Sequence, residues 1–220
     1  MKSYIAQHLD PGSFMGEVLF GLIMTLTFTL GAGLVIQEEG REGARAMLIG
    51  ILGCNLAWGV IDGVLYVLGR VFERGRLRRV GYDVRATTTT DEARRLVASE
   101  LDDLLEPVTE SVERDRLYAS IVARLQVAVP GPNRVRRDDV MGGLASGWLV
   151  FACSFPAVLP FLLLDEPHLA LRVSNAILLA LLFLVGYRHA RHTLAKPWLA
   201  GLVFLLAGLF LVAIAIRLGG

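Results

Sequence analysis

The chain has 220 residues, of which 54% are hydrophobic and 20% are charged, and its formal net charge is +1. Long stretches lack charged residues almost entirely, which excludes an ordinary soluble domain, because such a domain scatters charges over its whole surface. The two cysteines, Cys54 and Cys153, lie inside apolar runs and are expected to pack as small apolar residues without forming a disulfide framework.

Five stretches contain the roughly 20 apolar residues that a helix needs to cross a hydrocarbon core of about 30 Å. In chain order they are residues 18–36, 46–68, 140–164, 169–187 and 198–216. Because lipid offers no partner to an unpaired backbone group, each is expected to be helical. The first is predicted to be a retained span, since no small-residue cleavage pattern closes it. The sequence therefore predicts an all-α polytopic membrane protein with five transmembrane helices.

A charged segment separates the second and third spans. Residues 70–139 hold 14 of the 22 basic residues and 13 of the 21 acidic ones. Thr90 or Asp91 is expected to cap a helix, and Pro107 either ends that helix or opens a second one at its first turn. Two or three amphipathic helices are predicted. The chain is thus divided into residues 1–69 with two spans, the charged helical domain 70–139, and residues 140–220 with three spans.

Arginine and lysine near the ends of the spans predict the orientation in the membrane. Five arginines follow the second span, three precede the third, and three basic residues lie between the fourth and fifth, whereas the other two loops are acidic or balanced. The amino terminus and residues 70–139 are therefore expected in the cytoplasm, most simply at a bacterial inner membrane. These basic clusters are interpreted as topology and lipid-headgroup signals, and no nucleic-acid partner is expected.

Asp62 is the only acid well inside a predicted span. A carboxylate there costs at least about 2.5 kcal/mol on insertion scales, and such residues usually mark ion or proton pathways. Asn55 lies nearly two helical turns earlier, so both residues share one face. A structural hydrogen bond across a helix contact is the alternative interpretation. Gly59 and Gly63 flank this face and are expected to allow close packing of a neighbouring helix within the chain.

A cation site is predicted between the first two spans. At about 1.5 Å per residue, Asp62 is expected at the depth of Met24 and Thr25. The Asp62 carboxylate, the Asn55 carbonyl and a threonine oxygen could hold a hard or borderline divalent cation. Glu17, at the start of the first span, either joins this site or remains a charge at headgroup level. Thr25 can instead bond back to its own helix.

The charged segment carries acids at helical spacings of three and four residues, so that each set shares a face. They either gather divalent cations or form a solvated face with helix salt pairs. These acids are Glu100, Asp103, Glu106, Glu110 and Glu113. No phosphate loop, nucleophile motif or complete zinc signature is present in the sequence, so an enzyme with a tightly bound cofactor is not expected.

The layout of two spans, a charged helical insert and three further spans resembles the vacuolar iron transporter and CCC1-like family. The resemblance rests most on LASGWLVFACSFPAVLPFLLL (144–164) with its paired prolines, and on KPWLAGLVFLLAGLFLVAIAIRLGG (196–220). It implies a homodimeric transporter that exchanges ferrous iron or manganese for protons. It also implies that Glu17 and Asp62 match the family's acids in spans one and two, and that the insert's acids bind metal.

The sequence departs from this family at three points. Glu17 stands where the family has aspartate, no methionine lies near Asp62 in the second span, and residues 70–139 contain none. Loss of thioether ligands favours manganese, or another oxygen-preferring cation, over iron. The leading hypothesis is a transporter that moves divalent cations out of the cytoplasm. The alternative is a non-transporting membrane scaffold or sensor whose cytoplasmic helices dock a partner.

Overall fold

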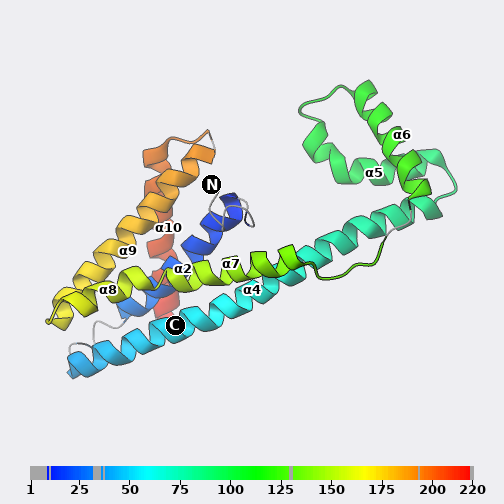
Figure 1. Ribbon diagram of the computed structural model, residues 1–220. Coiled ribbons are helices and arrows are strands. Elements are labelled where there is room, and N and C mark those ends of the chain that lie inside the picture. Colours follow the sequence, from blue (N-terminus) through cyan, green and yellow to red (C-terminus); the bar gives the residue numbers. More distant parts are fainter. Residues whose placement is uncertain are drawn as a thin grey trace, which may run out of the picture. The chain divides into compact units, whose positions relative to one another are not determined.

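The structure is a computed structural model, and it describes residues 9, 11–31, 36, 38–128, 131–192 and 194–218. Within these residues the regular structure is helical and no strand occurs (Figure 1). The helices are α2 (Pro11–Gly31), α4 (Arg41–Ala86), α5 (Thr90–Leu105), α6 (Ser111–Val127), α7 (Arg137–Ala152), α8 (Phe155–Leu163), α9 (Pro167–His189), the 3-10 helix η1 (Ala190–His192) and α10 (Pro197–Arg217).

The described residues contain five helical segments that are long and apolar enough to cross a membrane, counting α7 and α8 together. This confirms the predicted all-α polytopic fold. Three of these helices begin at a proline, namely Pro11, Pro167 and Pro197. Proline is favourable in the first turn because its fixed φ is already helical and its missing N–H would lack a partner there. The helices therefore start before the apolar stretches do.

The third predicted span is not one continuous helix. The helix α7 ends at Ala152, and α8 begins at Phe155 after a short turn. Pro156 has no N–H to bond the carbonyl of Ala152, and its ring clashes with that carbonyl, so the helix stops and restarts. Ala157 N–H instead bonds the Ser154 carbonyl at 3.1 Å. Pro156 thus divides the third span into two helices, whereas Pro160 lies within α8.

The helix α4 is much longer than the predicted second span. It runs for 46 residues and so extends for about 69 Å. Its apolar first part continues without a break into the charged segment, where ion pairs join Arg76 to Glu73 and Arg79 to Asp83 at helical spacing. Pairs at these spacings support an exposed helix by about 0.2–0.5 kcal/mol each.

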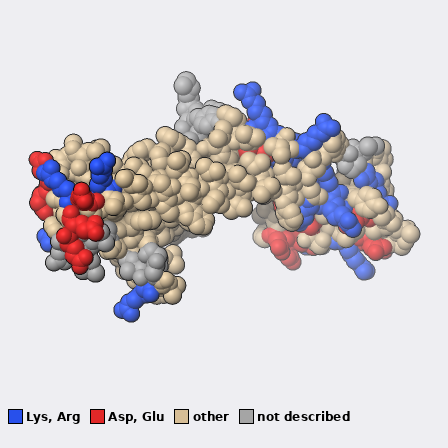
Figure 2. All heavy atoms as spheres, turned by 90° about the horizontal axis from the view of Figure 1, so that it is seen from below, with Lys and Arg blue, Asp and Glu red and all other residues tan. Residues whose placement is uncertain are grey.

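The chain forms two compact units, and α4 contributes to both. The transmembrane unit comprises residues 1–67 and 137–220. Its main core joins α2, α9 and α10 through Leu22, Leu26, Leu178, Leu182 and Val212. Apolar side chains such as Val60 and Phe210 are largely exposed, as expected of a surface that faces lipid. Figure 2 shows a wide surface of this unit without Lys, Arg, Asp or Glu side chains.

The charged unit comprises residues 68–136 and has a small core of its own. Val84 of α4, Val97 of α5 and Val122 of α6 are buried in it. The cap of α5 is Thr89, whose side chain accepts a hydrogen bond from Glu92 N–H, and not Thr90 or Asp91 as predicted. Thr90 and Asp91 already have helical backbone, so the extended residue before them becomes the cap.

Pro107 follows the end of the first short helix of the charged unit, which was one of the two alternatives predicted for this proline. The helix α5 ends at Leu105, and α6 does not begin until Ser111. Proline does not stand in the first turn of α6, whose N-cap is Glu110.

Candidate functional site

Asn55 lies at a junction of three helices in the transmembrane unit. Its side chain is fully buried. The Nδ2 group donates to Thr25 Oγ1 of α2 at 2.9 Å and to the carbonyl of Val150 of α7 at 3.3 Å. Thr25 Oγ1 also donates to the Gly21 carbonyl of its own helix at 2.8 Å, which was the structural alternative predicted for this threonine. The structure thus brings two predicted site residues, Asn55 and Thr25, into direct contact.

The other half of the Asn55 amide has no partner among the residues that the structure describes. Asn55 Oδ1 is buried and accepts no hydrogen bond from any described residue. A buried carbonyl oxygen without a donor costs about 1–3 kcal/mol of desolvation. The oxygen is therefore available to bind a cation, since amide carbonyl oxygens are common ligands of hard cations.

A second polar contact forms around Asp62, on the same face of α4. Ser146 Oγ of α7 donates to Asp62 Oδ2 at 2.5 Å. The side chain of Glu17 of α2 lies close to both Asp62 and Ser146. Glu17 and Asp62, which the sequence predicted to share a site, are therefore neighbours, and both side chains are half-buried.

The depth predicted for Asp62 was wrong. Asp62 meets Glu17, and Asn55 is the residue that lies against Thr25. Counting residues does not specify the axial shift between two helices, and α2 begins at Pro11, so Glu17 lies within the helix and not at its start. The predicted site residues thus form two separate contacts along the bundle, because Glu17 and Thr25 are about 12 Å apart along one helix.

Two buried polar residues of α7 were not predicted as site residues, and one of them, Ser146, contacts Asp62. Ser146 is fully buried, and Asp139 is only 3% exposed. They are seven residues apart and share one face of the helix. Asp139 stood just outside the predicted third span, so it was counted with the charged segment. Asp139 could have been identified from the sequence, because polar and small residues recur at helical spacing from this position. They are Asp139, Gly142, Gly143 and Ser146.

Glycines allow α4 and α7 to come close enough for this contact. Gly59 and Gly63 lie against Gly147 and Gly143, and a Cβ on any of them would come far too close to a facing carbonyl oxygen. Small residues four apart let membrane helices pack backbone to backbone. This confirms the expectation of close packing within the chain, and it explains how a short serine side chain reaches Asp62.

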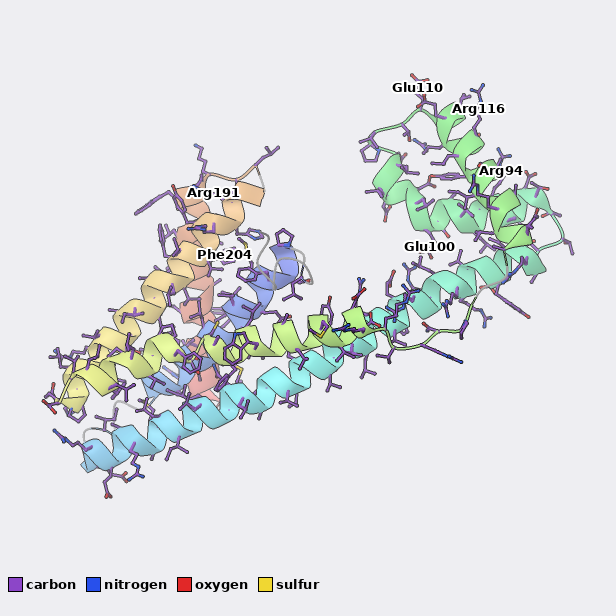
Figure 3. The ribbon with its side chains drawn as sticks, viewed as in Figure 1. Arg94, Glu100, Glu110, Arg116, Arg191 and Phe204 are labelled. Carbon is purple, nitrogen blue, oxygen red and sulfur yellow. The ribbon has the colours of Figure 1, made fainter. Side chains whose placement is uncertain are left out.

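The acids predicted in the charged unit are dispersed. Glu100 forms an ion pair with Arg76 and faces α4, whereas Glu110 lies at the start of α6 (Figure 3). Asp103, Glu106 and Glu113 are exposed. Among the residues described, no group of three or more His, Cys, Asp or Glu side chains is arranged to hold a metal ion.

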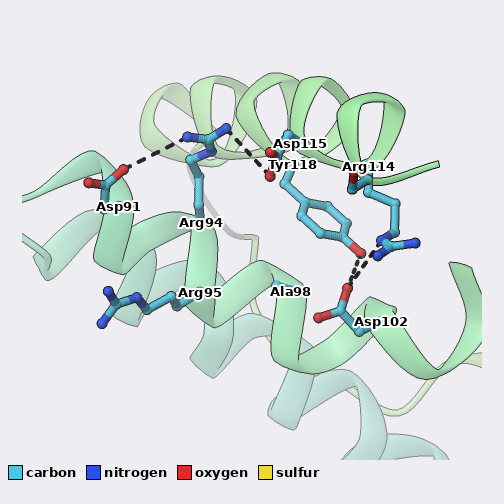
Figure 4. Close-up of a pocket in the computed structure, with 9 residues that line it drawn as sticks. Asp91, Arg94, Arg95, Ala98, Asp102, Arg114, Asp115 and Tyr118 are labelled. Atoms are coloured by element: carbon cyan, nitrogen blue, oxygen red, sulfur yellow. Dashed lines mark hydrogen bonds and ion pairs between the residues drawn. The ribbon is translucent and has the colours of Figure 1, made fainter. Parts of the chain in front are cut away.

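A different acid of α5 joins the two short helices. Asp102 accepts a hydrogen bond from the Tyr118 hydroxyl at 2.6 Å and lies 3.7 Å from Arg114 (Figure 4). Burial, together with the bond to Asp102, raises the pKa of Tyr118. Arg114 thus pairs with an acid of the other helix, because α5 and α6 pack against each other across this face.

The comparison with known families agrees with this architecture. The VIT family profile matches residues 86–220, which is more than half of the chain. The match covers α7, which carries Asp139 and Ser146, and it begins only at the last residue of α4, so it includes neither α2 nor the rest of α4. No match was found among curated proteins. The chain therefore belongs to the VIT family, whose members are membrane transporters of metal ions and not enzymes.

Proposed function

We propose that the protein exports a divalent cation, manganese or ferrous iron, from the cytoplasm in exchange for protons. The observation that carries this proposal is the meeting of Glu17 and Asp62 between α2 and α4. Two carboxyl groups in contact repel each other unless a proton or a cation lies between them. A site that alternates between these two occupants is the minimum that an exchanger needs.

The chemistry of the neighbouring groups supports an oxygen-preferring cation. The carboxylates of Glu17 and Asp62, the unpartnered Oδ1 of Asn55 and the hydroxyl of Thr25 are all oxygen ligands. Such ligands suit manganese and other hard cations, whereas softer ions prefer sulfur or imidazole. We therefore place the path along this face of α4, with manganese favoured over iron.

The scaffold alternative has one specific observation in its favour. Ser146 already bonds Asp62 across the contact of α4 and α7, as a purely structural pair would. A structural pair, however, gains nothing from the second acid at the same contact, since burying an additional carboxyl group is costly. Transport therefore accounts for Glu17 and Asp62 together, and the scaffold accounts for Asp62 alone.

Transport into proteoliposomes tests the proposal. Purified protein is reconstituted, and the initial uptake of Mn²⁺, Fe²⁺, Zn²⁺, Ca²⁺ and Mg²⁺ is measured with and without an imposed proton gradient. We expect uptake of Mn²⁺ and Fe²⁺ to be faster than in empty liposomes and to slow when a protonophore removes the gradient. Uptake no faster than in empty liposomes for every cation would support the scaffold.

The orientation of the chain gives a second test. If basic loops face the cytoplasm, Arg78 and Arg191 lie on one side of the membrane and Glu39 and His168 on the other. Single cysteines at these four positions, in a background without Cys54 and Cys153, are expected to react with an impermeant thiol reagent in two pairs. Any other division would contradict the proposed direction of export.

The exposed acids of the charged unit are proposed to collect cations at the cytoplasmic entrance. Replacing Glu106, Glu110 and Glu113 with glutamine removes three negative charges, so transport should fall severalfold at scarce metal and little at saturating metal. A variant that removes two acids elsewhere, Glu39→Gln with Glu42→Gln, serves as the control. Equal transport by the triple variant and the control at all metal concentrations would leave these acids as a solvated face.

The oligomeric state is the remaining part of the proposal. The family resemblance implies a homodimer embedded in lipid, and we adopt it for this chain. Light scattering of the detergent-solubilised protein is expected to give the mass of two chains.

A further inference from the structure

The charged unit contains a cavity of about 310 Å³ that has a basic lining. It lies between α4, the end of α6 and the segment just before α7. Four of its lining residues are arginines, and none is an acid. They are Arg74, Arg78, Arg85 and Arg136. Leu77 and Leu125 add an apolar side to the same cavity.

The spacing of residues on α4 creates this concentration of positive charge. Arg74, Arg78, Gly81 and Arg85 recur at intervals of three and four residues and so form one row along the helix. Like charges at such spacing destabilise a helix unless something compensates them. Gly81 stands in the middle of this row, and its lack of a side chain leaves space at the cavity wall.

The other arginines of this part of α4 are paired with acids. Arg76 contacts Glu73 and Glu100, and Arg79 contacts Asp83. In the cavity, Arg74 donates to the carbonyl of Arg134 at 3.1 Å.

Arg85 donates to the carbonyl of Ala128 at the end of α6. Arg78 is half-buried, and it makes no hydrogen bond or ion pair to any residue that the structure describes. A cation that is partly withdrawn from water is unfavourable without a counter-charge.

We propose that this cavity binds a phosphate-bearing anion, with Arg78 as the central contact and Arg74 and Arg85 beside it. The planar guanidinium group bonds phosphate oxygens in pairs, which makes arginine the preferred residue for phosphate recognition. The headgroup of an anionic phospholipid and free phosphate share this chemistry. Basic residues that follow a membrane span are typical of lipid contacts, and the apolar side of the cavity can receive a glycerol or acyl segment. The proposal does not depend on metal transport.

Ligand-induced stabilisation of the purified full-length protein in a neutral detergent tests this site. The midpoint of thermal unfolding is followed across concentrations of two probes, since a ligand at free concentration c that binds only the folded state stabilises it by RT ln(1 + c/Kd) and so raises the midpoint as c exceeds Kd. One probe is inorganic phosphate against chloride at equal ionic strength. The other is short-chain phosphatidylglycerol against phosphatidylcholine of the same chain length. We expect at least one anionic probe to raise the midpoint of the wild-type protein.

Three variants separate a built site from general surface charge. Arg78→Gln should weaken the apparent affinity about tenfold or more, because it removes the central charged hydrogen bonds. Arg79→Gln removes one charge from the neighbouring position of the same helix and should change the apparent affinity less than about twofold. Arg78→Lys keeps the charge but loses the paired geometry, so an intermediate affinity is expected.

The two probes also identify the source of the ligand. A response to phosphatidylglycerol alone supports the site as a lipid-headgroup site, and a response to inorganic phosphate supports it as a site for the free anion. If neither probe exceeds its control with the wild-type protein, the proposal fails. It fails equally if Arg78→Gln and Arg79→Gln weaken binding to the same extent, because diffuse charge would then account for it.

Discussion

Transport by the Asp62→Asn variant is expected to fall about a hundredfold or more, while the protein still inserts and unfolds at a normal temperature. The amide keeps the size of the side chain but removes its charge. At an effective dielectric constant of about 20, a unit charge attracts another at 4 Å by roughly 4 kcal/mol, and a divalent cation by more. Initial rates of Mn²⁺ uptake into proteoliposomes measure this loss at both low and saturating metal.

Glu42→Gln is the matched control, since it replaces an exposed acid with an amide on the same helix, α4. It should transport at the wild-type rate. Ser146→Ala removes only the donor to Asp62 and should reduce transport by a smaller factor than Asp62→Asn does. Normal transport by Asp62→Asn would remove Asp62 from the pathway and would leave its bond to Ser146 as a structural contact.

The Gly59→Ala variant is expected to unfold at a lower temperature than the wild-type protein. The added Cβ would lie 2.5 Å from the carbonyl oxygen of Gly147, so α4 and α7 must move apart. Overpacking of this kind costs about 1–3 kcal/mol. In a chain of this length, that cost corresponds to a decrease of roughly 3–10 °C in the midpoint of thermal unfolding. Separation of the helices also lengthens the Ser146–Asp62 contact, so transport should decrease.

Gly53→Ala makes the same substitution on the same helix, where a Cβ would meet no atom within 4 Å. Alanine has a higher helix propensity than glycine by about 0.8–1.0 kcal/mol, so this control should be neutral or slightly stabilising. Equal midpoints for Gly59→Ala and Gly53→Ala would show that the backbone contact between α4 and α7 does not limit stability.

The sequence predicted the number and class of the spans well, because the hydrophobic length of a membrane helix is a local property. Each of the five apolar stretches forms a helical segment of sufficient length. The ends were less predictable. Helical backbone continues past the apolar residues wherever nothing interrupts it, so α4 extends to Ala86. Pro156 interrupts the third span internally, since a proline removes a hydrogen bond regardless of hydropathy.

The candidate site was predicted in part. The cost of a carboxylate inside a span identified Asp62 from the sequence, and helical spacing placed Asn55 on the same face. The partners of these residues could not be obtained in this way. Helical periodicity specifies a face but not the rotation or the axial shift of the neighbouring helix. Glu17 therefore meets Asp62, and Thr25 meets Asn55, only because of how α2 packs against α4.

The sequence by itself determined that this protein is helical, crosses the membrane and carries a charged segment, because hydropathy, charge and proline act on the chain locally. Tertiary structure alone decided that α7 supplies Ser146 to Asp62 and that Arg78 has a basic cavity around it. Both depend on contacts between residues more than 40 positions apart. Gly59 and Gly147 illustrate the reason. Each glycine allows close approach of another helix, but only the packing of α4 against α7 places the two glycines opposite each other and brings the backbones into contact.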